Sequence, residues 1–220
     1  GAYFDELNRV IALLHSVDYA AIGLGDYGKP GNYIERQINR WIKQYRASET
    51  ERIEAMENLI DWLPKNIPQG DETTIVHGDY RMDNVMFHPT EPKILAVLDW
   101  ELSTLGHPLA DFSYHCMTWR LTPGQFRDMN GIDFRSLGIP TEEDYVAAYC
   151  GRTGRDHIPN WDFYMAYNMF RLAGILQGIM GRVKDGTAAS AHAMEQGKRA
   201  RPMAEAGWRQ VEKILKSATA

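Results

Sequence analysis

Apolar residues recur every three or four positions along most of the chain, a spacing that predicts amphipathic helices. The longest such segments cover residues 3–15, 32–46, 53–63 and 161–183. Further helices are expected from Pro108, which suits a first helical turn, from the capping residue Thr141, and over the tail from Ala188, with an interruption at Pro202. Ser48 and Glu51 have the spacing of a capping box and predict the start of helix 53–63.

A different pattern interrupts the helices between residues 74 and 98. Short apolar runs at 74–76, 85–87 and 94–98 predict strands, and Pro89 and Pro92 mark a turn between the last two. In a hairpin, the start of the first strand lies beside the end of the second. We therefore expect Asn84 and Asp99 to lie close together, with Asp79 on the incoming loop facing the same space.

Two carboxylates and one amide at one end of a hairpin supply oxygen ligands of the kind that Mg²⁺ prefers. This ion takes one or two carboxylates from a protein and completes its shell with water and substrate phosphates. The cluster therefore predicts a site for magnesium and a phosphorylated substrate.

The segments HGDYRMDN (77–84) and LDWE (98–101) resemble the catalytic loop and metal-binding Asp of the aminoglycoside phosphotransferase and choline kinase family. The likeness is greatest to the kinase-like domains associated with acyl-CoA dehydrogenases. It implies an α+β fold, mostly α-helical, namely the C-terminal lobe of a protein-kinase-like fold in which a small antiparallel β-hairpin carries the catalytic loop. It also implies ATP as co-substrate and Mg²⁺.

The resemblance implies a role for each residue of the motif. Asp79 would be the catalytic base, and Asn84 and Asp99 would hold Mg²⁺. Arg81 would supply charge to the transferred phosphate or be a surface arginine. His77 would support the catalytic loop, as would Asp111 of the G-x-P-x-x-D segment. Alternatively, Asp111 could complement a helix dipole. Finally, the border of the metal site, with no assigned chemistry, comprises Trp100 and Glu101.

One part of the family pattern is missing. No V-A-I-K-like strand precedes His77, and residues 1–70 have helical spacing. We therefore expect residues 1–220 to form a single domain equivalent to the C-terminal lobe, without the N-terminal ATP-clamping lobe. Such a fragment should be inactive or nearly so, and the surface that the missing lobe would cover should favour a homodimer.

Composition narrows the class of protein. A length of 220 residues suits one sizeable core, and a net charge of −5 argues against nucleic-acid binding. Two cysteines, Cys116 and Cys150, fit a reducing cytosol rather than a disulfide framework. No apolar run reaches the length of a membrane span. The expectation is a cytoplasmic protein that binds a small molecule.

Three other patterns have plainer interpretations. Gly23, Gly25 and Gly28 match a nucleotide-binding spacing, but a helix rather than a strand precedes them, so a structural loop is expected. His107 and His115 lie near Cys116 in the sequence but lack the paired spacing of a zinc site. A basic helix face suits solvent exposure, or an anionic substrate such as a CoA thioester; it comprises Arg36, Arg40, Lys43 and Arg46.

The predicted function is transfer of the ATP γ-phosphate to a hydroxyl of a small molecule, either a hydroxyacyl compound or an aminoglycoside-like acceptor. A kinase-like module that binds proteins without catalysis is the main alternative, and the intact motif argues against it. A metal-dependent phosphoesterase would need a richer set of ligands. The sequence leaves the acceptor, the oligomeric state and nucleotide binding by the fragment open.

Overall fold

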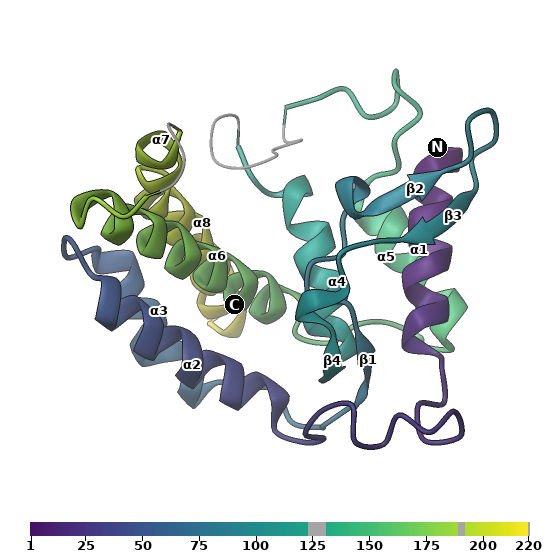
Figure 1. Ribbon diagram of the computed structural model, residues 1–220, viewed down its shortest axis with the longest axis horizontal. Helices are drawn as coiled ribbons and strands as arrows, with labels where there is room; N and C mark the ends of the chain where they lie inside the picture. Colours follow the sequence, from purple (N-terminus) through teal and green to yellow (C-terminus); the bar gives the residue numbers. More distant parts are fainter. Residues whose placement is uncertain (123–130, 189–191, 220) are drawn as a thin grey trace. The chain divides into compact units, whose positions relative to one another are not determined.

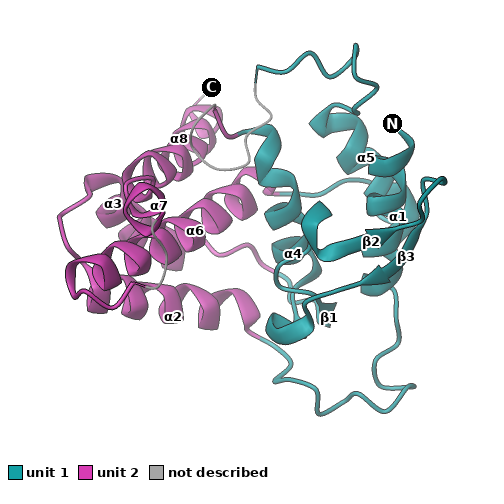
Figure 2. Cartoon of the chain, turned by 45° about the horizontal axis from the view of Figure 1, so that its top comes forward, with its two compact units in different colours: residues 1–31, 70–120, 129–159 teal, residues 32–69, 121–128, 160–220 magenta. Residues whose placement is uncertain are grey.

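The computed structural model describes residues 1–122, 131–188 and 192–219. Figure 1 shows the helices and strands of the chain, which divides into two compact units that Figure 2 shows in different colours. Unit 1 comprises residues 1–31, 70–120 and 129–159, and unit 2 comprises residues 32–69, 121–128 and 160–220. The single domain expected from the sequence stays a prediction. Among the described residues, every helix is too short or too polar to cross a membrane.

Unit 1 combines helices with short antiparallel strands (Figure 2). Its helices are α1 (Ala2–His15), α4 (Pro108–Cys116) and α5 (Glu142–Thr153), and its strands are β1 (Thr74–Val76), β2 (Val85–Phe87), β3 (Ile94–Val97) and β4 (Thr104–Gly106). Single 3-10 turns complete it, at η2 (Met82–Asn84), η3 (Trp100–Leu102) and η4 (Met117–Trp119).

The strands form two separate antiparallel pairs. Strand β2 pairs with β3 and places Val85 opposite Val97, which confirms the predicted hairpin. Strand β1 pairs with β4, with Thr74 opposite Gly106. The sequence did not predict β4, because a Thr-Leu-Gly segment is too short to show an alternating pattern.

Helix α1 forms one side of the core of unit 1, where it packs against α5 and β1. Its Leu7 and Ile11 are fully buried. In the same core, the rings of Phe112 and Tyr149 stack with their centroids 3.8 Å apart. The predicted starts of α4 and α5 are confirmed, since Pro108 opens α4 and the Thr141 hydroxyl caps α5. A packed core of this kind gives the strand ends a rigid base.

The regular elements of unit 2, within its described residues, are all helices. Unit 2 contains α2 (Tyr33–Ser48), α3 (Glu54–Trp62), the 3-10 turn η1 (Leu63–Lys65), α6 (Trp161–Lys184), α7 (Ala193–Gly197) and α8 (Ala200–Ala218). Helix α6 packs against α2, α7 and α8, as Figure 1 shows. Gly207 allows α8 to approach α3 and α6 closely, because a Cβ at this position would lie 3.2 Å from both Leu59 Cδ1 in α3 and Met169 Cβ in α6.

The predicted capping box is wrong. Helix α2 continues as far as Ser48, and the Ser48 hydroxyl donates to the carbonyl oxygen of Gln44 at 3.0 Å instead of capping α3. A serine in a last helical turn commonly bonds back to the carbonyl four residues earlier. Helix α3 begins at Glu54, and Glu51 forms an ion pair with Arg201.

The expected interruption at Pro202 is also wrong. Helix α8 begins at Ala200, so Pro202 lies in its first turn, where a backbone N–H has no helical acceptor to lose. The break falls instead between α7 and α8. Ala188 lies outside any helix, and residues 189–191 of the predicted helical tail lie outside the described residues.

Candidate active site

Loop 77–84 connects β1 to β2 and begins with a tight backbone turn. Gly78 has a φ of 84°, a left-handed conformation that favours glycine. A Cβ at this position would lie 2.6 Å from the carbonyl oxygen of Leu102. Both the conformation and the close approach therefore require glycine at the second position of the HGDYRMDN segment.

The carboxylate of Asp111 lies beneath this turn and accepts hydrogen bonds from its backbone. The His77 N–H donates to Oδ2 at 2.7 Å, and the Gly78 N–H donates to Oδ1 at 2.8 Å. Asp111 is only 4% exposed, so it is not a surface residue that complements a helix dipole. Burial alone would raise the pKa of this carboxyl, but the hydrogen bonds from His15 and the two loop amides hold the pKa below its ordinary value.

The side chain of His77 connects the loop to the end of β3. Its Nδ1 accepts from the Asp79 N–H at 3.2 Å, so Nε2 carries the proton and donates to the Leu98 carbonyl oxygen at 2.8 Å. The indole ring of Trp100 lies against this imidazole, with the ring centroids 5.0 Å apart. The Trp100 indole N–H donates to Val97, which fixes the ring at the edge of the site.

Asp79 and Asn84 lie together, as the spacing predicts. The Asn84 Nδ2 donates to the Asp79 carbonyl oxygen at 2.9 Å and to its carboxylate Oδ2 at 3.0 Å. Both of these bonds use the amide nitrogen and direct the amide oxygen elsewhere. The Arg81 Nε forms an ion pair with Asp79 Oδ2 at 3.1 Å. The carboxylate that the motif predicts as a base therefore lies between an amide and a cation.

The hairpin brings Asp99 next to the residue that pairs with Asn84. The Leu98 N–H donates to the Asn84 carbonyl oxygen at 2.8 Å, and Asp99 follows Leu98 directly. Asp99 is exposed and has a left-handed backbone, with φ of 65° and ψ of 58°. Left-handed non-glycine residues are uncommon and concentrate at functional sites. Glu101, also exposed, lies two residues further on, within η3.

The donor atoms of this region fit magnesium better than zinc. An amide oxygen from Asn84 and a carboxylate from Asp99 are the ligands that Mg²⁺ takes beside water and phosphates. Within the described part of the chain, no three His, Cys, Asp or Glu side chains form a metal-binding group. Instead, the His107 Nδ1 caps α4, and the His115 Nε2 hydrogen-bonds the Tyr145 hydroxyl at 2.8 Å.

The loop that contains Gly23, Gly25 and Gly28 has a packing role. A Cβ at Gly28 would lie 2.3 Å from Thr104 Oγ1 and 2.7 Å from the Leu105 backbone nitrogen. Gly25, in contrast, has open space around its Cα. The loop therefore needs glycine where it passes β4, which agrees with the structural interpretation of this segment.

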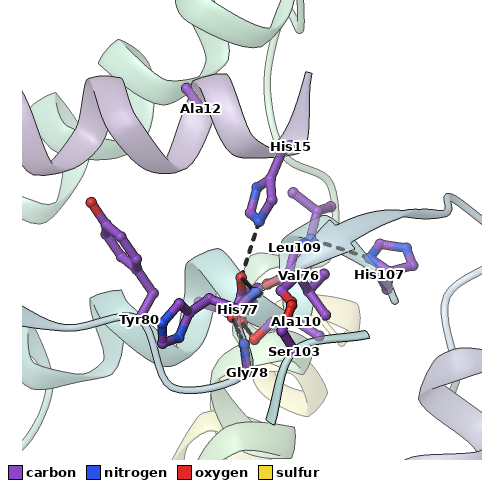
Figure 3. Close-up of polar contacts among 12 residues, drawn as sticks. Ala12, His15, Val76, His77, Gly78, Tyr80, Ser103, His107, Leu109 and Ala110 are labelled. Carbon is purple, nitrogen blue, oxygen red and sulfur yellow. Dashed lines mark hydrogen bonds and ion pairs between the residues drawn. The ribbon is translucent and has the colours of Figure 1, made fainter. Parts of the chain in front are cut away.

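Two residues of the hydrogen-bond network around Asp111, His15 and Tyr149, were not predicted. The imidazole of His15, the last residue of α1, lies 3.2 Å from Asp111 Oδ2 through Nε2 and 2.7 Å from the Tyr149 hydroxyl through Nδ1. Figure 3 shows His15 extending from its helix toward Gly78 and His77. No motif spacing points to His15, because 96 residues separate it from Asp111.

Comparison with known proteins shows which family the chain belongs to. The model of the phosphotransferase enzyme family matches residues 1–167. The chain belongs to this family. A curated relative, the mouse protein named acyl-CoA dehydrogenase family member 10, is 50% identical over 210 residues, which are 94% of this chain and 20% of the relative. The chain therefore spans about a fifth of the length of that protein.

Solved structures of phosphotransferases share the fold. One from Ralstonia eutropha, described as a candidate aminoglycoside phosphotransferase, has a TM-score of 0.94 and 66% identity, and the similarity covers 96% of this chain and 65% of that one. Choline kinase from Cryptosporidium parvum has a TM-score of 0.59 at 11% identity, covering 98% and 66%. A complex of aminoglycoside phosphotransferase APH(4)-Ia with AMP-PNP and hygromycin B has a TM-score of 0.57 at 14% identity, covering 95% and 64%. These matches confirm the predicted kinase-like, mostly helical fold, in which β2 and β3 form the small antiparallel hairpin.

Proposed function

We propose that this phosphotransferase domain is the acceptor- and metal-binding part of a small-molecule kinase that transfers the γ-phosphate of ATP to a hydroxyl. The observation that carries the proposal is the pair of bonds made by Asn84. Its side chain holds Asp79, and its backbone pairs with Leu98, immediately before Asp99. ATP is the proposed donor because a phosphotransferase of the same fold binds the ATP analogue AMP-PNP.

Asp79 is the proposed base. Its carboxylate would accept the proton of the substrate hydroxyl while the hydroxyl oxygen attacks the γ-phosphorus in line. The bond between that phosphorus and the β–γ bridging oxygen breaks, so that ADP leaves and a phosphate ester forms. The hydrogen bond from Asn84 at 3.0 Å fixes the carboxylate orientation that this transfer needs.

Asn84 and Asp99 are the proposed magnesium ligands, through the amide oxygen of the first and the carboxylate of the second. Bound Mg²⁺ would neutralise charge on the donor phosphates. Arg81, whose Nε lies 3.1 Å from Asp79 Oδ2, would add positive charge near the transferred phosphate. His77 and Asp111 would support the loop, and Trp100 and Glu101 would border the metal.

The proposed acceptor is a hydroxyacyl compound rather than an aminoglycoside. The support is the name of the mouse relative, which places a similar segment in a protein of the acyl-CoA dehydrogenase family. Fold relatives differ widely in substrate, so this part of the proposal depends on that relationship alone. Because the chain spans only part of its relatives, the activity is proposed for the whole protein that contains it.

The experiment is a measurement of ATP consumption by the whole protein with hydroxyacyl-CoA thioesters, free hydroxy acids and aminoglycosides, each with and without Mg²⁺. Phosphorylation of a hydroxyacyl compound that requires Mg²⁺ would support the full proposal. Activity on aminoglycosides alone would contradict the proposed acceptor. If no acceptor is phosphorylated and calorimetry detects no binding of Mg²⁺ with ATP, the domain is a non-catalytic binding module.

A further inference from the structure

A buried chain of polar side chains lies beneath loop 77–84. It runs from the Tyr149 hydroxyl to His15 and on to the Asp111 carboxylate, across distances of 2.7 Å and 3.2 Å. The side chains of His15 and Asp111 are each 1% exposed. Figure 3 shows the imidazole of His15 between its helix and the turn at His77 and Gly78.

The demands of a buried carboxylate explain why His15 matters. Asp111 Oδ1 accepts from Gly78, whereas Oδ2 accepts from both His77 and His15. Within the described residues, His15 is the side chain that hydrogen-bonds this carboxylate. A buried carboxylate that loses a donor must lower its energy in another way, for instance by rotating or by taking up a proton.

The Tyr149 hydroxyl hydrogen-bonds the other ring nitrogen of His15. In the neutral imidazole that donates from Nε2 to the carboxylate, Nδ1 is an acceptor, which matches a hydrogen bond from the Tyr149 hydroxyl. Burial raises the pKa of Tyr149, so the hydroxyl keeps its proton and remains a donor. The phenol ring stacks on Phe112, which holds the hydroxyl in place.

The position of Asp79 depends on the same carboxylate. Asp111 holds the His77 and Gly78 amides, and the next amide, that of Asp79, donates to the His77 Nδ1 at 3.2 Å. A rotation of Asp111 would release both amides and move the loop that carries Asp79. Close contact between Gly78 and Leu102 leaves the turn little alternative space.

We infer that His15 is a positioning residue for phosphoryl transfer: from helix α1 it fixes the Asp111 carboxylate and, through it, the backbone that orients Asp79. This inference rests on the proposed function for its catalytic consequence. Its structural consequence, that His15 protects the His77 and Gly78 amides, can be tested without any turnover.

The test compares His15→Leu, which has no donor, with His15→Gln, whose side-chain amide can donate to Asp111. Hydrogen–deuterium exchange of the whole protein is followed in the peptide 74–84, with peptide 85–97 as the internal control. In His15→Leu we expect exchange at His77 and Gly78 to accelerate about tenfold, the effect of losing one hydrogen bond to a charged group. His15→Gln should recover most of the protection, and peptide 85–97 should be unchanged.

The kinetic measurement separates positioning from general loss of structure. With an acceptor in hand, we expect kcat of His15→Leu to fall about 10- to 100-fold, because misplacing a catalytic group by an ångström costs that much. The KM of the acceptor should stay within about twofold, since His15 does not touch substrate. If His15→Leu does not fold, Tyr149→Phe replaces it, with the same expected direction of both effects.

Exchange at His77 and Gly78 at the wild-type rate in His15→Leu would overturn the inference. So would equal acceleration in peptides 74–84 and 85–97, because that result indicates general loosening. If the whole protein phosphorylates no acceptor, the proposed function fails, but exchange that accelerates in His15→Leu and recovers in His15→Gln would still support the positioning role.

Discussion

The two sides of loop 77–84 differ in exposure and in bonding. Beneath the loop, Asp111 and His15 are buried and hydrogen-bonded to one another. On the proposed reaction side, Asp79 is partly exposed and Asp99 is exposed. Groups that meet substrate must reach solvent, whereas groups that fix the backbone must be dry and fully bonded. Changes beneath the loop should therefore alter both stability and activity, and changes on the reaction side should alter activity alone.

The largest effect on stability should come from Asp111→Ala. The change leaves the buried amides of His77 and Gly78 without an acceptor, which we expect to lower the free energy of unfolding by about 3 kcal/mol or more. Urea denaturation followed by circular dichroism measures it. Asp99→Asn is the matched control, because Asp99 is exposed and asparagine tolerates its left-handed backbone, and it should leave unfolding nearly unchanged. Equal losses in the two variants would break the comparison between the two sides.

The next largest effect is that low pH should lower the free energy of unfolding through buried histidines. Burial lowers the pKa of His115, one turn along α4 from Asp111, from 6.5 to about 4. The unfolded chain therefore takes up this proton first, so stability falls as the pH drops from 6.5 toward 4, by about 1.4 kcal/mol per pH unit for this histidine. His107, also with a lowered pKa, acts in the same direction.

The contribution of Asp111 has a different pH range. Its folded pKa lies below the ordinary value of 3.8, so its stabilisation is present above that pH and is lost only at lower pH. Denaturation at several pH values checks both ranges. The variant His115→Gln should flatten the slope between pH 6.5 and 4, and an unaltered slope would contradict the assignment.

On the reaction side, Asp99→Asn should weaken metal binding without weakening the fold. Loss of a carboxylate that binds the ion directly should exceed the effect of losing a supporting residue, so we expect at least about a 100-fold drop in Mn²⁺ affinity in the presence of ATP. Electron paramagnetic resonance of Mn²⁺ measures it, and Glu101→Gln is the control, an exposed carboxylate two residues away. A larger effect of Glu101→Gln would reverse the proposed assignment of the ligand.

The smallest effect distinguishes two glycines of one loop. Gly28→Ala would place a Cβ 2.3 Å from Thr104 Oγ1, and we expect it to cost about 1–3 kcal/mol of unfolding free energy. Gly25→Ala meets open space and should be neutral or slightly stabilising. Thermal unfolding of the two variants compares them directly. If Gly25→Ala destabilises the fold and Gly28→Ala does not, the packing interpretation is wrong.

The sequence predicted those parts of the fold that depend on local patterns. Apolar spacing located the long helices, and a turn between two apolar runs located the β2–β3 hairpin. Pairing of β1 with β4 could not be predicted, because Thr104–Gly106 is too short to show a period and its partner lies about thirty residues earlier. Likewise, the capping pattern at Ser48 failed because the preceding helix continued through it.

Prediction of the candidate site shows a similar division. The loop spacing located Asp79 and Asn84, which the structure brings to within 3.0 Å. Asp111 was predicted through its family resemblance rather than through any physical signal of burial. His15 was missed because its contact with Asp111 joins positions 96 residues apart. Long-range polar contacts depend on how the core packs, and single-sequence patterns carry little information about that packing.

The central claim is most directly tested by phosphate transfer from ATP by the whole protein and its Asp79→Asn variant, followed by ³¹P NMR with a hydroxyacyl acceptor. Asp83→Asn changes a neighbouring carboxylate of the same loop and is the control. We expect Asp79→Asn to lower kcat by about 10²- to 10⁴-fold, the range for loss of a general base, with no change in unfolding and with Asp83→Asn near wild type. Wild-type turnover in Asp79→Asn would contradict the assignment of this loop as the catalytic loop.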